Sequence, residues 1–395
     1  MNKITTHLWF DTQAGEAAEF YVSAFRNAKI NGKYVLNNTP SGSVDVVDMT
    51  IEDHDFTLIS AGPYFKINPS ISFFVNFDPS QDKDAKAHLD ELWTKLSPGG
   101  QALMPLQKYP FSEWYGWIQD KYGVSWQLIL TNPKGEPRPM IVPSLLFTKA
   151  GVGKADEAID FWVSVFKNSK RGTTARYPKG MEPDKEGNVM FADFMLGNQW
   201  FAAMESAQPH AFAFNEGVSL MVHCKDQEEI DYYWEKLSAV PESDLPAPRP
   251  DTFYVYVLLC GDGSMYIGQT QDIKKRWREH ESGAGAEYTK NFKPTQVIHY
   301  EEFPTRQAAV DREQKLKTGF GRKWLKREWK AGRTRQAGQC GWLKDKYGVS
   351  WQIVPDAMDE MMAKGTPDQI GRVTQAFLKM KKFDLAELKK VYEGE

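Results

Sequence analysis

The 395-residue chain repeats part of its own sequence, and the repeat is interrupted. Residues 116–127 read GWIQDKYGVSWQ and residues 341–352 read GWLKDKYGVSWQ, with ten identities in twelve positions. Two further pairs of segments match in the same order, 19–25 with 160–166 and 93–97 with 234–238. Repeats at this level of identity predict two tandem copies of one structural unit.

The distance between matching segments changes along the chain. The pairs that begin at 19 and at 93 are 141 positions apart, whereas residues 116–127 and 341–352 are 225 positions apart. The second copy therefore holds 84 additional residues, which enter after position 238. This is the size of a small domain, and chains accept such insertions at exposed loop tips. We expect the host segment 238–341 to be a surface loop that carries an inserted domain.

Charge separates the insert from its host. Residues 251–335 hold 17 Lys and Arg against 11 Asp and Glu, a balance of +6, within a chain whose net charge is −3. The rest of the chain is therefore at −9. A basic block of this kind is typical of segments that bind nucleic acid. On charge alone, a solvated helical face is an equally good interpretation.

Proline marks the entry to the insert. Four prolines predict an extended linker there, namely Pro241, Pro246, Pro248 and Pro250. The exit is expected at residues 333–338, RTRQAG. We divide the chain into a first host unit at 1–135, the first part of the second unit at 138–243, the insert at 251–332, the last strands of the second unit at 338–357 and a helical tail at 358–395.

Composition limits the class of protein. With 41% hydrophobic and 13% aromatic residues, the chain can build packed cores. It has no run near the roughly 18 apolar residues that a membrane helix needs, so we expect no membrane partner. The N-terminus, MNKITTHLWF, has no apolar signal core. Three scattered cysteines, Cys224, Cys260 and Cys340, fit a reducing compartment. We therefore expect a cytoplasmic protein.

The host alternates strands and helices. Strand-like segments are expected at 4–10, 44–50, 56–61 and 71–77, and helices at 14–25 and 85–96. This pattern predicts an α+β fold. The segments HLWF at 7–10, EAAEFYVSAF at 16–25 and DKYGVSWQ near the end of each unit resemble the PhnB-like branch of the vicinal-oxygen-chelate (VOC) superfamily, whose members are called glyoxalase/bleomycin-resistance-like or demethylubiquinone methyltransferase-like.

This resemblance covers about residues 1–243 and 338–395. It implies two tandem units of βαβββ modules that curl into an open barrel around a cleft, with homodimers as one arrangement of such modules. It also implies cleft residues that bind a small molecule: His7, Gln127, His223 and Gln352. A metal there is doubtful, because one histidine and one amide are a poor ligand set, and a hydrogen-bonded or metal-free pocket is the simpler interpretation.

The insert opens with a hairpin. Strands are expected at 253–259 and 265–270 around a Gly261–Ser264 turn. A symmetric four-residue loop would put Tyr256 and Tyr266 on opposite faces. A loop of three or five residues would pair Cys260 with Tyr266 and put both tyrosines on one face, and the Asp-Gly in the turn favours such a bulged loop.

Two helices and a third strand follow in the insert. The first helix is expected at 272–281 with Asp272 as its N-cap, so Arg276 and His280 share one helical face. A third strand is expected at 297–303 and a second helix at 305–316.

These elements carry a second resemblance. Tyr254-Val255-Tyr256, then Tyr266-Ile267-Gly268, Arg276, His280 and the pair Arg312-Glu313 resemble the GIY-YIG nuclease domain in order and spacing. The segment Glu287-Tyr288-Thr289 is similar to its small single-domain bacterial members. The resemblance spans about 253–330 and implies a small α/β domain with a three-stranded antiparallel sheet and helices.

The resemblance implies a metal-dependent DNA endonuclease. Tyr256 or Tyr266 would position or deprotonate the attacking water, and His280 would assist as a base or hydrogen-bond partner. Arg276 would clamp the phosphate. Glu313 would hold one Mg²⁺ or Mn²⁺ ion. Basic residues would follow the DNA backbone, namely Lys274, Lys275, Lys290, Lys293, Lys323 and Lys326.

A rival interpretation uses the same residues differently. Tyrosines on strands are more often core than catalytic, and Glu313 could simply pair with Arg312 or Lys317. The chain would then be a non-nucleolytic protein whose host binds a small molecule and whose insert is inert or merely binds DNA. If Arg276 and Glu313 face one pocket with the tyrosines, the nuclease is favoured; if Glu313 is held in an ion pair, the rival is favoured.

Overall fold

The computed structural model describes residues 3–238, 240, 242, 245–330 and 340–395. The chain forms two compact units. The first contains residues 1–223 with 358–375, and the second contains residues 224–357 with 376–393. None of the helices in this described part combines the length and the apolar character that a membrane crossing requires.

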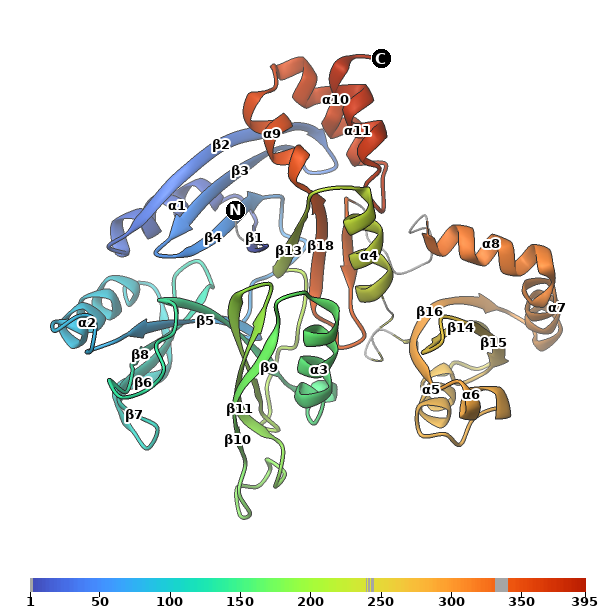
Figure 1. The fold of residues 1–395 in the computed structure, drawn as a ribbon, viewed down its shortest axis with the longest axis horizontal. Coiled ribbons are helices and arrows are strands. Elements are labelled where there is room, and N and C mark those ends of the chain that lie inside the picture. The colour runs from blue at the N-terminus through green and yellow to red at the C-terminus, as the bar shows by residue number, and fades with distance from the viewer. Residues whose placement is uncertain (1–2, 239, 241, 243–244, 331–339) are drawn as a thin grey trace. The chain divides into compact units, whose positions relative to one another are not determined.

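The first unit contains three successive βαβββ modules (Figure 1). The first consists of β1 (Ile4–Phe10), α1 (Ala14–Ala24), β2 (Ala28–Thr39), β3 (Gly42–Ile51) and β4 (His54–Ser60). The second consists of β5 (Ile71–Phe77), α2 (Ala85–Leu96), β6 (Gln101–Tyr109), β7 (Ser112–Gln119) and β8 (Ser125–Leu130). The third consists of β9 (Ile141–Phe147), a 3₁₀ turn (Lys149–Gly151), α3 (Ala155–Val165), β10 (Lys170–Arg176), β11 (Val189–Leu196) and β12 (Gln199–Glu205), and β13 (Val218–Cys224) follows it.

These modules share sheets. β5 of the second module pairs antiparallel with β9 of the third, and the eight strands lie in the order β10-β11-β12-β9-β5-β8-β7-β6. The first module lies in another sheet, in the order β13-β1-β4-β3-β2. This mixed arrangement of VOC-type modules confirms the predicted fold class.

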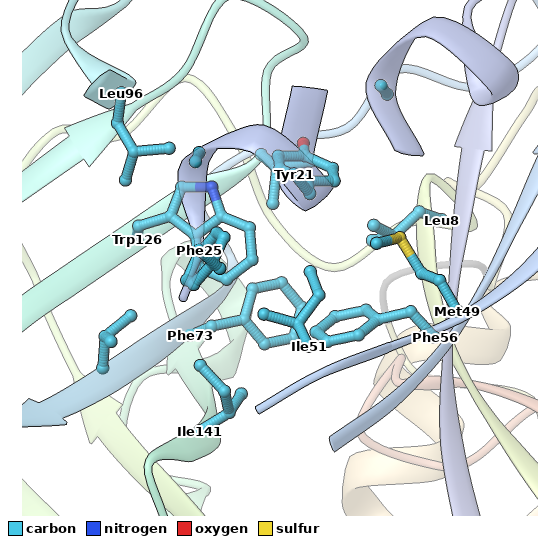
Figure 2. Close-up of a cluster of buried hydrophobic side chains, with 14 of the residues drawn as sticks. Leu8, Tyr21, Phe25, Met49, Ile51, Phe56, Phe73, Leu96, Trp126 and Ile141 are labelled. Carbon is cyan, nitrogen blue, oxygen red and sulfur yellow. The ribbon is translucent and has the colours of Figure 1, made fainter. Parts of the chain in front are cut away.

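One large apolar cluster of the first unit includes the buried faces of helices α1 and α2. Alternate residues of the strands contribute to it, such as Leu8 and Phe10 of β1. Figure 2 shows its aromatic centre, where Phe56, Phe73 and Trp126 come together. The rings of Phe56 and Phe73 have centroids 5.2 Å apart, as do those of Phe73 and Trp126. Burial of this apolar surface stabilises the unit.

The repeated segment DKYGVSW forms a buried turn in both copies. Between β7 and β8, one oxygen of Asp120 accepts hydrogen bonds from the backbone N–H groups of Tyr122 and Val124, at 2.9 and 3.1 Å. The other accepts from the indole of Trp126 at 2.9 Å and from the Tyr21 hydroxyl at 2.8 Å. The strongest sequence repeat is therefore a structural turn, because four donors converge on one carboxylate.

The second unit begins with α4 (Gln227–Leu237) and contains the insert. Its helices and strands are β14 (Phe253–Cys260), β15 (Met265–Thr270), α5 (Ile273–Glu281), α6 (Glu287–Asn291), β16 (Pro294–Phe303), α7 (Arg306–Lys317) and α8 (Gly319–Lys330). The host then resumes with β17 (Trp342–Lys344) and β18 (Ser350–Pro355). The tail follows as α9 (Asp356–Lys364) and α10 (Pro367–Phe377), most of whose residues belong to the first unit, and α11 (Leu385–Glu393) of the second.

The insert is built on the predicted three-stranded antiparallel sheet, in the order β15-β14-β16 (Figure 1). Its hairpin corrects one expectation: Tyr266 pairs with Leu258 and not with Cys260. Cys260 instead bonds through its N–H to the carbonyl of Ser264 at 2.8 Å, across a turn that Gly263 permits with φ +80°. Tyr256 and Tyr266 still share a face, because Leu258 lies two residues from Tyr256.

The sheet of the insert has a core on each face. Val255 and Val257 pack with Ala309 and Leu316 of α7. The alternate residues Tyr254 and Tyr256 pack with Ile273 and Trp277 of α5. The linker residues Val240 and Leu245 also belong to this second cluster. The insert's core therefore reaches back before position 251; the boundary there stays a prediction, and Pro241 and the exit at 333–338 lie outside the described residues.

Candidate functional site

Four predicted residues of the insert meet on the face of the sheet that α5 covers. β14 presents Tyr256 and β15 presents Tyr266, while α5 carries Arg276 and His280. The Tyr256 hydroxyl lies 2.8 Å from His280 Nε2 and 3.2 Å from Arg276 Nε. The rings of Tyr266 and His280 have centroids 4.9 Å apart. The hairpin register and one turn of helix thus bring these four side chains together.

The hydrogen bonds around His280 have one consistent direction. The Thr289 hydroxyl donates to the carbonyl of Ala286 at 2.8 Å, so its oxygen accepts from His280 Nδ1 at 2.7 Å. With the proton on Nδ1, Nε2 of a neutral His280 can only accept, and Tyr256 must donate to it. Arg276 Nε–H donates to the oxygen of Tyr256 in turn. A directed chain therefore runs from Arg276 through Tyr256 and His280 to Thr289.

Burial and charge set the protonation of this chain. Burial, helped by the positive charge of Arg276, lowers the pKa of His280 to about 4 from the usual 6.5, so the imidazole is neutral near pH 7. Burial also raises the pKa of Tyr256, which keeps its proton. Burial lowers the pKa of Arg276, but the ion pair with Glu279 and the contact with Tyr256 raise it above its ordinary value.

Two glycines make room for these side chains. A Cβ at Gly268, the last residue of the Tyr-Ile-Gly motif, would lie 2.5 Å from the Tyr256 hydroxyl oxygen. A Cβ at Gly285 would collide with Nδ1 of His280. Any larger residue at either position would displace the chain of hydrogen bonds. Thr289 and Gly285 were missed as site residues in the sequence, although Thr289 lies within the motif-like segment 287–289.

Glu313 lies apart from this group. It is on α7, whose Ala309 and Leu316 pack on the opposite face of the sheet from Tyr256. Its side chain is 17% exposed and its carboxylate pairs with Lys317 at 2.5 Å. Within the described ranges, Glu313 makes no hydrogen bond or ion pair with the tyrosines, Arg276 or His280. The two observations that would distinguish the nuclease from its rival therefore point in different directions. Arg276 contacts Tyr256, which favours the nuclease, whereas Glu313 is held in an ion pair with Lys317, which favours the rival.

The neighbouring Arg312 is fixed separately. Its guanidinium makes two 2.8 Å bonds to the carboxylate of Glu301 on β16, and its carbon lies 4.9 Å from the ring centre of Trp324. His299 Nε2–H donates to the same carboxylate at 2.9 Å. Although burial alone would raise it, the hydrogen bonds from His299 and Arg312 lower the pKa of Glu301 to about 2. This cluster ties α7 to β16.

The six predicted nucleic-acid-binding lysines all lie on helices or turns of the insert. Lys274 is half-buried and the other five are exposed. Lys274 and Lys275 line a cavity of about 520 Å³ together with Arg278. Lys290 and Lys293 lie on and just after α6, and Lys323 and Lys326 lie on α8. Their role in binding stays a prediction.

The four host residues predicted to line a cleft are all buried on strands, and their role there stays a prediction. His7 is buried on β1, and burial lowers its pKa to about 3. Gln127 accepts from the Tyr115 hydroxyl at 2.6 Å and donates to Ser72 at 2.8 Å. His223 contacts Thr5 at 2.9 Å and lies 3.2 Å from a carboxylate oxygen of Asp359.

Gln352 of the second unit is buried. Throughout the described part of the chain, no three His, Cys, Asp or Glu side chains are grouped to hold a metal ion. Gln127 and His223 of the first unit are hydrogen-bonded to neighbouring side chains.

Two family models match the chain, and their matches overlap only at residues 322–327. The model described as 3-demethylubiquinone-9 3-methyltransferase matches residues 2–129, 139–247 and 322–354, which is more than half of the chain. The model described as GIY-YIG catalytic domain matches residues 252–327. The match to the first model is interrupted between residues 247 and 322, and the domain bounds inferred from the repeat spacing stay a prediction.

Similar proteins and solved structures each match only a part of the chain. A UPF0213 protein of Haloquadratum walsbyi is 47% identical over 68 residues, 17% of this chain and 76% of that protein. One of Staphylococcus saprophyticus is 43% identical over 76 residues, 19% of this chain and 93% of that protein. A solved structure of a PhnB protein from Bacillus cereus is 35% identical and covers 33% of this chain and all of its own, with a TM-score of 0.30. A UPF0213 structure from Bacillus halodurans is 35% identical and covers 19% of this chain and 83% of its own, with a TM-score of 0.14.

Proposed function

Because the chain belongs to the 3-demethylubiquinone-9 3-methyltransferase family and carries a GIY-YIG catalytic domain within it, we propose that it is a DNA endonuclease that hydrolyses phosphodiester bonds through this domain. The observation that carries the proposal is the directed chain Arg276–Tyr256–His280–Thr289. If Tyr256 served only to pack the core, its hydroxyl would not need both the Arg276 guanidinium and the neutral His280 imidazole as hydrogen-bond partners. The host would serve as a scaffold that binds a small molecule.

Tyr256 and His280 supply a route for the proton of the attacking water. The Tyr256 hydroxyl takes a proton from the water and passes its own to Nε2 of neutral His280, which becomes imidazolium. The water oxygen forms its bond to phosphorus as the bond to the leaving oxygen breaks. The Thr289 oxygen accepts from Nδ1 and holds the imidazole in the required orientation.

Arg276 provides positive charge beside the reacting phosphate. Its Nε is bound to Tyr256 and its Nη1 to Glu279, at 3.2 and 2.7 Å, so the guanidinium is fixed before a substrate arrives. A preorganised cation stabilises the charge that develops on the phosphate oxygens. The ring of Tyr266, which contacts His280 at a tilt of 58°, would limit the access of bulk water to the base.

Glu313 is the proposed ligand for one Mg²⁺ or Mn²⁺ ion. Its largely buried carboxylate is a hard oxygen donor, which suits such an ion when water and phosphate oxygens complete the shell. The ammonium of Lys317 pairs with this carboxylate, which shows that the carboxylate can hold a positively charged group at this position. An ion held there would supply positive charge to phosphate oxygens that reach α7.

One observation favours the rival function. The Glu313–Lys317 ion pair is what a purely structural glutamate would make, and the insert would then bind DNA without cutting it. In that case the activity of the chain would be the binding of a small molecule by the host. For either function, Cys224, Cys260 and Cys340, which all lie in the described part of the chain, form no disulfide, which supports a location in the cytoplasm.

Nicking assays test the proposal. Purified full-length protein is incubated with supercoiled plasmid and with branched DNA, in Mg²⁺, in Mn²⁺ and in EDTA. We expect metal-dependent cutting that Glu313→Ala abolishes. The matched control is Asp311→Ala, an exposed carboxylate on the same helix, which should cut normally. Absence of cutting on every substrate by the folded protein would reject the nuclease in favour of the rival.

A further inference from the structure

A row of aromatic rings leads from the site to the surface of the insert. The ring of Tyr266, which lies beside His280, stacks on Tyr288 of α6 with centroids 6.1 Å apart and planes 28° apart. Tyr288 in turn contacts Phe292, with centroids 4.9 Å apart and planes at 39°. Three rings from β15 and from the region of α6 thus form a continuous row.

The outer end of this row is open to solvent. Tyr288 is 39% exposed and Phe292 is 41% exposed, which is unusual for large aromatic residues that touch one another. The Tyr288 hydroxyl bonds to Ser264 Oγ at 2.9 Å in the hairpin turn, so this ring is held in place from both sides. A fixed, exposed ring binds a flat partner at a small entropic cost.

The surroundings of the row are basic. Lys290 lies on α6 between the two exposed rings in sequence, and Lys293 follows Phe292 directly; both are exposed. Rings that stack on bases, together with cations that contact phosphates, are the two components of surfaces that bind single-stranded nucleic acid. Lysines alone would bind the backbone of any duplex equally well.

We propose that Tyr266, Tyr288 and Phe292 form a stacking platform for unpaired nucleobases, so that the insert takes single-stranded nucleic acid in preference to a paired duplex. In a duplex, neighbouring bases cover both faces of each base, and only an unpaired or displaced base can stack on a side chain. This inference rests on the proposed function, because it names the substrate class of the same site. The platform would deliver the strand next to Tyr256 and Arg276.

Binding without cutting tests this inference. Full-length protein in EDTA is titrated, by fluorescence anisotropy, into labelled oligonucleotides of one sequence as single-stranded DNA, single-stranded RNA and duplex DNA. We expect at least one single strand to bind about tenfold more tightly than the duplex. The DNA and RNA arms distinguish the two sources of unpaired bases.

Substitutions of Tyr288 and Phe292 test whether these rings cause the preference for single strands. Tyr288→Leu should lower the affinity for the preferred single strand about tenfold and leave duplex binding unchanged. Tyr288→Phe, which keeps the ring and loses only the bond to Ser264, should bind nearly as the parent does. Phe292→Leu repeats the test if Tyr288→Leu does not fold, and Phe111→Leu, an exposed ring of the host, should have no effect.

The outcomes separate this inference from the nuclease. Equal affinity for single strand and duplex, or unchanged single-strand binding by folded Tyr288→Leu and Phe292→Leu, would overturn the platform even if plasmid is cut. Ring-dependent binding of single strands with no cutting under any metal would support the platform and reject the nuclease.

Discussion

His280 differs from an exposed histidine because of what surrounds it. Its side chain is fully buried, with Tyr256 on one nitrogen and Thr289 on the other. Those partners assign its tautomer, and burial beside Arg276 keeps it neutral. A neutral imidazole that accepts from a tyrosine can receive a proton, whereas an imidazolium could not. The ability of His280 to act as a base therefore depends on its contacts with Tyr256 and Thr289.

Removal of the base should slow cutting and leave DNA binding intact. We expect His280→Gln to lower kcat about 10²-fold, because glutamine can accept from Tyr256 but cannot take its proton. Tyr256→Phe should lose a similar amount, and the double variant little more, since the two side chains act as one relay. Single-turnover cleavage and binding in EDTA measure both quantities. Full activity of either single variant would contradict the relay.

The low pKa of His280 predicts where cutting fails in acid. A base works only when unprotonated, and the pKa is lowered from 6.5 to about 4. The unprotonated fraction therefore stays high as pH falls through 6.5 and drops only as it approaches 4. We expect kcat/KM to be nearly level between pH 8 and about 5.5 and to decline below. An acid limb centred near pH 6.5 would show that His280 is not the group that titrates.

Lys317 should compete with the metal ion for Glu313. Removal of its ammonium in Lys317→Met frees the carboxylate, so half-maximal cutting should need about two- to fivefold less Mg²⁺, as expected for a partly exposed ion pair. Lys315→Met, an exposed lysine on the same helix, is the control and should leave the requirement unchanged. A loss of all cutting in Lys317→Met would instead assign the lysine a direct role.

At the scale of elements, the buried turn between strands recurs in both copies of the repeat. Asp345 accepts from the backbone N–H groups of Tyr347 and Val349, at 2.9 and 3.1 Å, and from the indole of Trp351 at 2.8 Å. Asp120 makes the same contacts in the first unit, and the pKa of its carboxyl is raised by burial. The segment is therefore repeated because it builds a turn.

Loss of either aspartate should destabilise the unit that contains it. Asp120→Ala leaves two backbone N–H groups, one indole and one hydroxyl buried without an acceptor, and we expect a loss of about 3 kcal/mol in the free energy of unfolding. Asp345→Ala should cost a similar amount, and exposed Asp45→Ala almost nothing. Urea denaturation followed by tryptophan fluorescence measures the change. A loss under about 1 kcal/mol for both would contradict this account.

Helix α6 illustrates an element that the sequence did not reveal. It has only five residues, too few to be stable alone, and it carries no periodic apolar pattern. The structure stabilises it through Thr289 against His280 and through Tyr288 against Tyr266. Helices α5 and α7 were predicted, and a capping residue precedes each: Asp272 accepts from Lys275 N–H and Thr305 from Ala308 N–H. The 12-residue helix α8 was not predicted.

At the scale of the whole molecule, the insert has its own core but shares it with its linker. Val240 and Leu245 are 3% and 2% exposed within the cluster around Tyr254, and Val240 N–H bonds to the carbonyl of Val297 at 2.7 Å. The linker therefore contributes to the packing of the insert as well as joining it to the host.

The linker should stabilise the isolated insert. A fragment of residues 238–330 should be more stable than one of residues 252–330 by about 2–4 kcal/mol, because it buries two more aliphatic side chains. Thermal unfolding followed by circular dichroism measures the difference, and Val240→Ala in the longer fragment should remove part of it. Equal melting temperatures of the two fragments would show that the linker residues do not stabilise the core.

The sequence alone indicated the tandem repeat, an insertion of 84 residues, and the shared face of Arg276 and His280 on α5, whereas it left the faces of the hairpin tyrosines open. These follow from spacing and periodicity, which are local properties of the chain. Only the tertiary structure decided that β5 pairs with β9, that Cys260 pairs with Ser264, that Arg276 and His280 meet the hydroxyl of Tyr256, and that Glu313 pairs with Lys317. Such contacts depend on how elements pack across the sequence, and local patterns leave that packing open.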